Sequence, residues 1–187
     1  MSVPMGMVMV LPMGGMDRDQ QEAKVARAMG LAFPLPRISE DSTVLDAGAW
    51  LTDGTLALST NPMGFDLLIA RWSPNVLCRS DTLSEASMDA IERVAVAAVD
   101  GIGVRFGYLS HYSNHLEKDW IEQQVLVPLL SEDWGDLVSP LYHLVMHAAD
   151  IPLSCPTSAV VLHASEAGRI LRIGQHRSPF GHIEENG

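Results

Sequence analysis

The apolar residues of this chain occur in short blocks separated by turn signals, and this pattern limits the fold more than any other feature. The clearest signal is Thr52-Asp53-Gly54, which stands between two β-rich blocks, residues 44–51 and 55–60. Asp-Gly in such a position is a strong signal for a β-hairpin. A third β-rich block, residues 65–72, follows and is expected to pair antiparallel with its neighbour. These blocks predict a sheet built largely from hairpins.

Both ends of the chain add strands to this expectation. Met5, Met7 and Met9 alternate with smaller apolar residues, so residues 1–16 are expected to form a buried strand followed by a turn. Residues 157–163 and 169–175 are expected to form a last hairpin, and a further strand is expected over 102–109. The polar residues 178–187 are expected to form a flexible tail.

Helix signals fall between these strands. Asp17 and Gln20 match a capping box for a helix over 17–29, with Gly30 as its stop. A second capping box, Thr82 with Glu85, starts an apolar stripe at helical spacing that ends before Gly101. Further helices are expected over 117–127, where Pro128 limits the helix, and over 139–149. The chain is therefore expected to be a single α+β domain over 1–187, a largely antiparallel sheet packed against three or four helices.

Charge and composition narrow the classes of partner. The chain has 187 residues, 47% of them hydrophobic, which is enough for a core and argues against intrinsic disorder. Its formal net charge of −11 opposes binding to nucleic acid and docking on anionic lipid. The same charge favours solubility and, where there is a partner, a basic one. Residues 1–16 contain no Lys or Arg and no apolar run spans a membrane, so a cytoplasmic protein is expected.

The two cysteines, Cys78 and Cys155, lie far apart in the sequence and form no CxxC pair. In a reducing cytoplasm they are expected to be buried thiols. One long-range disulfide between them is the alternative that the sequence leaves open.

Two His-x-x-x-His pairs are the most chemical-looking feature of the chain: His111 with His115, and His143 with His147. On a helix, residues four apart share a face, so both rings of a pair could reach one divalent transition metal. The second pair falls in the expected helix 139–149, on the side opposite its apolar stripe. Leu144 follows His143 where a zincin needs its glutamate, so a metalloprotease is not expected. The competing interpretation is four surface histidines and no cofactor.

Acidic residues are concentrated between positions 117 and 136. Tryptophans accompany them, and exposed aromatics on an acidic patch are typical of a surface that binds a basic protein. The competing interpretation is a solvated helix face with both indoles in the core. The candidate partner-binding residues are Glu117, Asp119, Trp120, Glu122, Glu132, Asp133, Trp134 and Asp136.

Three functional hypotheses follow. The first is a non-enzymatic intracellular protein that binds, neutralises or escorts a basic protein partner, with the charge and size of an immunity or inhibitor protein. The second is a metal-binding protein or enzyme that uses a His-lined pocket, although the chain has no G-x-S-x-G, P-loop or G-x-G-x-x-G motif to name a catalytic residue. The third is an accessory subunit of a larger complex, which shares every sequence feature of the first.

Overall fold

One eight-stranded antiparallel sheet dominates the structure, a computed structural model that describes residues 5–12, 16–37, 47–51, 54–60, 66–72, 78–79, 82–83, 85–111, 122–139, 142–154 and 159–173. The strand order is β2-β3-β4-β1-β7-β8-β10-β9. A separate two-stranded sheet pairs β5 (Cys78–Arg79) with β6 (Thr82–Leu83). The strands of the large sheet are β1 (Met5–Val10), β2 (Ala47–Leu51), β3 (Gly54–Thr60), β4 (Asp66–Trp72), β7 (Phe106–His111), β8 (Leu144–Ala148), β9 (Val160–Ala164) and β10 (Gly168–Arg172).

Strand β1 lies in the middle of this sheet, antiparallel to β4 on one side and to β7 on the other. All of its residues are buried. Successive side chains of a strand point to opposite faces. Met5, Met7 and Met9 accordingly belong to one hydrophobic cluster, while Val8 and Val10 belong to a second cluster on the opposite face. The sheet therefore has two cores, one on each face.

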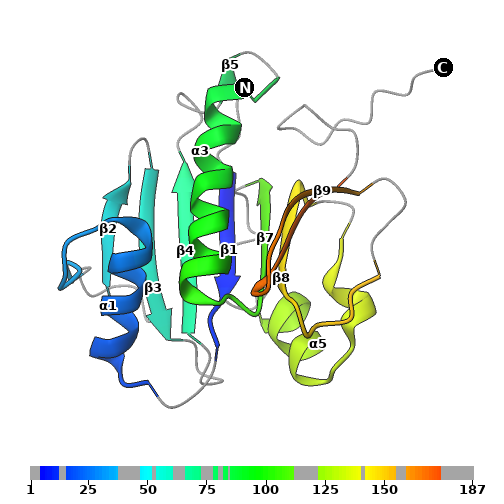
Figure 1. The fold of residues 1–187 in the computed structure, drawn as a ribbon, viewed down its shortest axis with the longest axis horizontal. Coiled ribbons are helices and arrows are strands. Elements are labelled where there is room, and N and C mark those ends of the chain that lie inside the picture. The colour runs from blue at the N-terminus through cyan, green and yellow to red at the C-terminus, as the bar shows by residue number, and fades with distance from the viewer. Residues whose placement is uncertain are drawn as a thin grey trace.

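The first face is covered by helices α1 (Arg18–Met29) and α3 (Glu85–Val96) (Figure 1). Helix α3 continues into the π-helical segment η1 (Ala97–Ile102), which packs against α1. Gly101 allows this close approach, because a Cβ at that position would lie 2.8 Å from the Cβ of Ala28. The face beneath is made of aliphatic side chains such as Leu56, Leu68 and Leu109.

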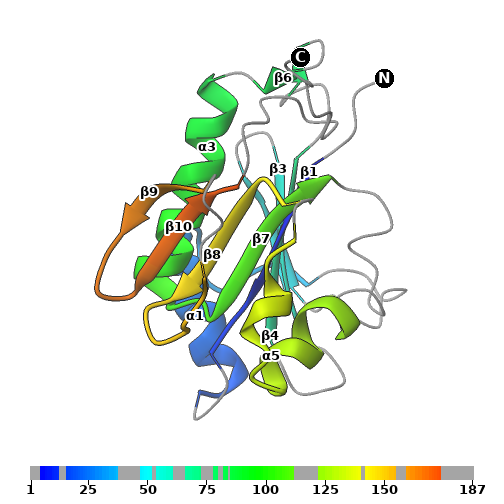
Figure 2. The ribbon, with the colours of Figure 1, turned by 90° about the vertical axis from the view of Figure 1, so that its right-hand side faces the viewer.

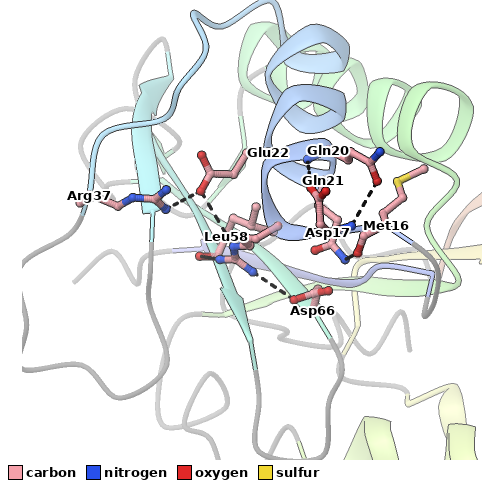
Figure 3. Close-up of polar contacts among 9 residues, drawn as sticks. Met16, Asp17, Gln20, Gln21, Glu22, Arg37, Leu58 and Asp66 are labelled. Atoms are coloured by element: carbon pink, nitrogen blue, oxygen red, sulfur yellow. Dashed lines mark hydrogen bonds and ion pairs between the residues drawn. The ribbon is translucent and has the colours of Figure 1, made fainter.

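Polar contacts hold α1 to the sheet (Figure 3). The Arg18 guanidinium donates to Asp66 Oδ1 at 3.0 Å and to the carbonyl oxygen of Leu58 at 3.0 Å. Glu22 is fully buried, and its carboxylate accepts a hydrogen bond from Arg37. Helix α1 is thus tied to β3, to β4 and to the segment that leads into β2.

The second face is covered by the π-helical segment η3 (Glu122–Leu126), the short helix α5 (Val127–Leu130) and the 3-10 turn η4 (Trp134–Leu137). Figure 2 shows α5 on the side of the sheet opposite to α3. Val125, Leu126 and Leu137 are buried there against strand residues such as Phe106 and Tyr108.

The expected α+β class with three or four helices packed on the sheet is wrong. Within the described residues the α-helices are α1, α3 and the four-residue α5, so the fold is dominated by its sheet. The main reason is the segment over 139–149, which was expected to be a helix. Residues 144–148 instead form β8, between β7 and β10. Because β8 is buried on both faces, its sequence Leu-Val-Met-His-Ala lacks the alternation of apolar and polar residues that would distinguish a strand from a helix.

Other sequence predictions are confirmed in the structure. Helix α1 begins after Asp17, whose capping box with Gln20 is present, and ends at Gly30 in the left-handed conformation. The hairpin of β2 and β3 and the antiparallel pairing of β4 with β3 are also as expected. Helix α3, however, begins at Glu85, because Thr82 belongs to β6. Its π-helical continuation ends at Gly103, two residues after the expected stop at Gly101.

Several expectations lie outside what the structure describes, including the tail 178–187 and Cys155. The described backbone includes Cys78 in β5, but not its side chain. Among the helices of the described residues, none combines the length and apolarity needed to cross a membrane.

The packing of α3 gives the first testable prediction. Ile91 is completely buried on the inner side of this helix, so Ile91→Ala removes apolar contact and leaves a cavity. We expect the free energy of unfolding to fall by about 2–5 kcal/mol, measured by urea denaturation. The control is Arg93→Ala on the exposed side of the same helix, which should cost less than about 0.5 kcal/mol. Equal effects of the two changes would contradict this packing.

Candidate functional site

The sequence-predicted acidic segment is only partly described. Glu117, Asp119 and Trp120 lie outside the described residues. Glu122 begins η3 and Asp136 lies in η4, but their side chains are not described. The residues of this segment whose side chains can be placed are Glu132, Asp133 and Trp134.

Helix α5 and the turn that ends it form the most distinctive surface of this segment. The amide of Asp133 donates to the carbonyl of Pro128 at 2.9 Å, and the amide of Glu132 donates to the carbonyl of Leu129 at 3.4 Å. These two bonds are those of a Schellman motif, in which the residue after the C-cap adopts the left-handed conformation. That residue is Glu132, whose φ is 56°.

Pro128 lies within α5. The sequence had suggested instead that this proline ends the helix before it.

Glu132 is unfavourable for stability at this position in two ways. Among the described residues it is the non-glycine residue with a positive φ, a conformation that glycine adopts without steric cost. It also follows the C-terminal end of a helix, where the helix dipole favours a cation over a carboxylate. The side chain is exposed and so is that of its neighbour Asp133. The local fold therefore presents an exposed carboxylate at position 132, where glycine would stabilise it more, and a second exposed carboxylate beside it at Asp133.

Apolar side chains lie beside these carboxylates. Val127 is 45% exposed and Leu130 is 49% exposed, although Leu129 between them is buried. Trp134 is half-buried and packs against the second core cluster, so the indole is largely a core group. We define the α5 surface as Val127, Leu130, Glu132 and Asp133. Its apolar part is aliphatic, whereas the sequence had predicted aromatic anchors.

The histidine pairs have a different geometry from the one expected. His143 precedes β8 and His147 lies within it, so the helix that would have brought them together is absent. Four residues of a strand span about 13 Å, whereas Zn–N bonds are about 2 Å long. His115 is outside the described residues, and the side chain of His111 is not described. Within the part of the chain that can be placed, no group of three or more His, Cys, Asp or Glu could hold a metal ion.

His147 is nevertheless unusual. It is 4% exposed, and in the sheet register it lies opposite Phe106 on β7 and Arg169 on β10. Its Nδ1 lies 2.9 Å from the carbonyl oxygen of Ala148, which can only accept, so Nδ1 carries the proton. Burial lowers the pKa of His147 below 6.5, and the charge of Arg169 lowers it further, against an opposing effect of the bond to Ala148. The imidazole is therefore neutral at neutral pH.

Two tyrosines complete the polar groups of this face. The rings of Tyr108 and Tyr142 stack with their centroids 4.2 Å apart. Burial raises the pKa of both phenols well above the usual value near 10, so both remain protonated. Ser110 and His143 are also buried at the adjoining ends of β7 and β8. Tyr108 and Tyr142 belong to the second core cluster, together with the buried residues of η3, α5 and η4.

The buried imidazole predicts a pH dependence of stability. Because the pKa of His147 is lower in the folded state, the unfolded state binds the proton more readily, and stability is lost as pH falls below about 6.5. We expect His147→Asn, whose amide can still donate to Ala148, to reduce this loss. Urea denaturation between about pH 5.5 and about pH 7.5 measures it. An unchanged pH slope in the variant would show that His147 is not the titrating group.

The sequence signal for the α5 surface was present but difficult to use. Residues 125–130 read Val-Leu-Val-Pro-Leu-Leu, which is more apolar than a helix with one buried face requires. That excess indicates exposed aliphatic side chains, and Val127 and Leu130 are those side chains. No protein-family model matches this chain, and no match is found among curated proteins.

Proposed function

We propose that this protein is a non-enzymatic cytoplasmic protein that binds a basic protein partner through the α5 surface. In this role it neutralises or escorts the partner, as an immunity or inhibitor protein does. The partner would supply Arg or Lys side chains to Glu132 and Asp133 and an apolar group to Val127 and Leu130. An accessory subunit of a larger complex would use the same surface in the same way.

The observation that carries this proposal is the conformation of Glu132. An exposed carboxylate in the left-handed conformation, at the end of a helix, opposes local stability. Backbone strain of this kind persists where the surrounding structure holds it, and it is found more often at functional sites. The two Schellman bonds supply the restraint here. A basic partner would turn the electrostatic cost into an attraction.

The surroundings of Glu132 support a protein partner. Val127 and Leu130 form an exposed aliphatic pair one turn apart beside the two carboxylates. Apolar contacts surrounded by charges are the usual arrangement of protein interfaces, where the apolar groups supply affinity and the charges supply association rate and specificity. The net charge of −11 adds a long-range attraction for any basic protein. We extend the proposed surface to further residues of the same acidic segment: Glu117, Asp119, Trp120, Glu122 and Asp136. Trp134 would support this surface from the side that packs against the second core cluster.

The first experiment identifies the partner. Wild-type protein and a Leu130→Asp variant are used as baits in lysate of the native organism, with Glu166→Gln as a matched control. Glu166 is an exposed acid in the turn between β9 and β10, remote in sequence from α5. We expect a basic protein to be retained by the wild type and the control and lost with Leu130→Asp. Retention that is insensitive to Leu130→Asp, or an acidic partner, would contradict the proposal.

Glu132→Gly gives a prediction that separates binding from stability. Glycine relieves the left-handed strain, so we expect the free energy of unfolding to rise by about 1 kcal/mol. Loss of the carboxylate should at the same time slow association with the identified partner and flatten its salt dependence. Denaturation and stopped-flow association measure the two effects. The control Glu132→Ala removes the charge but keeps a Cβ, so it should slow association without the gain in stability.

A further inference from the structure

Strand β9 is one edge of the large sheet, and it is unusually apolar for an edge. Its sequence is Val-Val-Leu-His-Ala, without an Asp, Glu, Lys, Arg or Pro. Val160 is 45% exposed and Val161 is 53% exposed. In the described structure β9 pairs with β10 on one side only. Proteins usually protect such an edge with charges, proline or a covering segment, because its free amides and carbonyls can pair with another strand.

The opposite edge of the same sheet shows this protection. Residues 35–37 run along the outer side of β2, where Arg37 forms a bridge with Ala47 and the Gly48 amide donates to the carbonyl of Pro36 at 2.9 Å. The buried carboxylate of Glu22 holds Arg37 in place (Figure 3). The fold therefore covers part of one edge with its own chain, and among the described residues it does not do so at β9.

Strand β9 is also held firmly in position. His163 Nε2 lies 2.8 Å from Asp100 Oδ2, and Ser165 Oγ donates to Asp100 Oδ1 at 2.6 Å. Asp100 belongs to η1, so these contacts connect the β9–β10 hairpin to the helical layer on the first face. An edge that is already ordered loses less conformational entropy when another strand pairs with it.

The charges beside β9 are positive. Arg169 and Arg172 on the neighbouring strand β10 are both exposed. Arg172 lies opposite Val160, and Arg169 lies opposite Ala164. Since Ile170 belongs to the first core cluster and Leu171 to the second, these arginines point to opposite faces of the sheet. Glu166 lies in the turn between β9 and β10, and both oxygens of Asp100 are already engaged.

We propose that β9 is a second docking site, at which an extended, acidic segment of another protein adds to the sheet as a further antiparallel or parallel strand. Backbone hydrogen bonds to β9 would supply the pairing. Apolar side chains on the two faces of the added strand would contact Val160 and Val161, and Asp or Glu side chains would reach Arg169 and Arg172. This site differs from the α5 surface in the sign of its charge and in its mode of recognition.

A displayed library of random peptides of about twelve residues is the probe, since such a peptide exceeds the length of an average strand. The library is selected on the full chain. We expect enriched peptides that carry apolar residues on both faces of the added strand, together with Asp or Glu. A synthetic copy of one of them, methylated at the amides of one register, should lose binding at least about tenfold. The copy methylated in the other register should retain it, because alternate amides of an edge strand point away from β9.

Val160→Glu is the decisive variant. The new carboxylate would lie opposite Arg172, so it neutralises that arginine and repels an acidic peptide. It also forms an opposite-charge cross-strand pair with Arg172, so the sheet tolerates the change. We expect peptide affinity to fall at least about tenfold. The matched control is Trp50→Glu, which adds the same charge at an exposed apolar residue of β2, the strand at the opposite edge of the sheet. It should leave peptide affinity unchanged.

Three outcomes would overturn the proposal. One is the absence of peptides that prefer the wild type over Val160→Glu. Another is the selection of basic peptides, or of peptides unaffected by methylation in either register. The third is a dimer, seen by sedimentation, that Val160→Glu dissociates, since β9 would then pair with a second copy of this chain. The α5 surface is tested by different variants and a different partner, so either site can fail without the other.

Discussion

The rest of the structure depends on the complete burial of β1. A central strand without exposed residues must have a hydrophobic layer on each side, because its side chains alternate between the two faces. The methionines face α1 and α3, and Val8 and Val10 face the η3–α5–η4 layer. The helical elements are therefore required on both faces, and their positions follow from those of the central strands. The flexible, unbranched side chains of methionine adapt readily to the packing of two helices and a π-helical segment.

The sequence predicted the hairpins and α1 well because their signals are local. Asp-Gly, a capping box and a helix-ending glycine each act over a few residues, and tertiary packing did not change them. The error at 139–149 has the opposite origin. Ser139-Pro140 resembles a helix start, but residues 144–148 form a strand because they pair with β7 and β10, which are distant in sequence. Gly168 shows how close that packing is, because a Cβ there would lie 2.2 Å from the carbonyl oxygen of His147.

The candidate site was located by charge but not by geometry. Glu132 and Asp133 were recognised as acidic residues, yet the feature that distinguishes Glu132 is a backbone conformation that glutamate rarely adopts. No sequence pattern predicts it, since the local preference opposes it. The sequence left open whether the indoles are exposed anchors or core groups, and for Trp134 the structure gives a half-buried ring. Trp134 has a large apolar ring, and the second core could bury much of it, whereas the shorter Val127 and Leu130 lie on the outer side of α5.

Two places on the described surface depart from what stability alone would select. At the end of α5, a carboxylate occupies a position that favours glycine and a positive charge. At β9, uncharged valines occupy an edge where a charge or a proline would prevent pairing. By contrast, α1 has both of its caps, and residues 35–37 cover part of the β2 edge. The same chain therefore follows these rules at α1 and at part of the β2 edge, and departs from them at α5 and at β9. These two departures are the observations on which the two proposed docking sites rest.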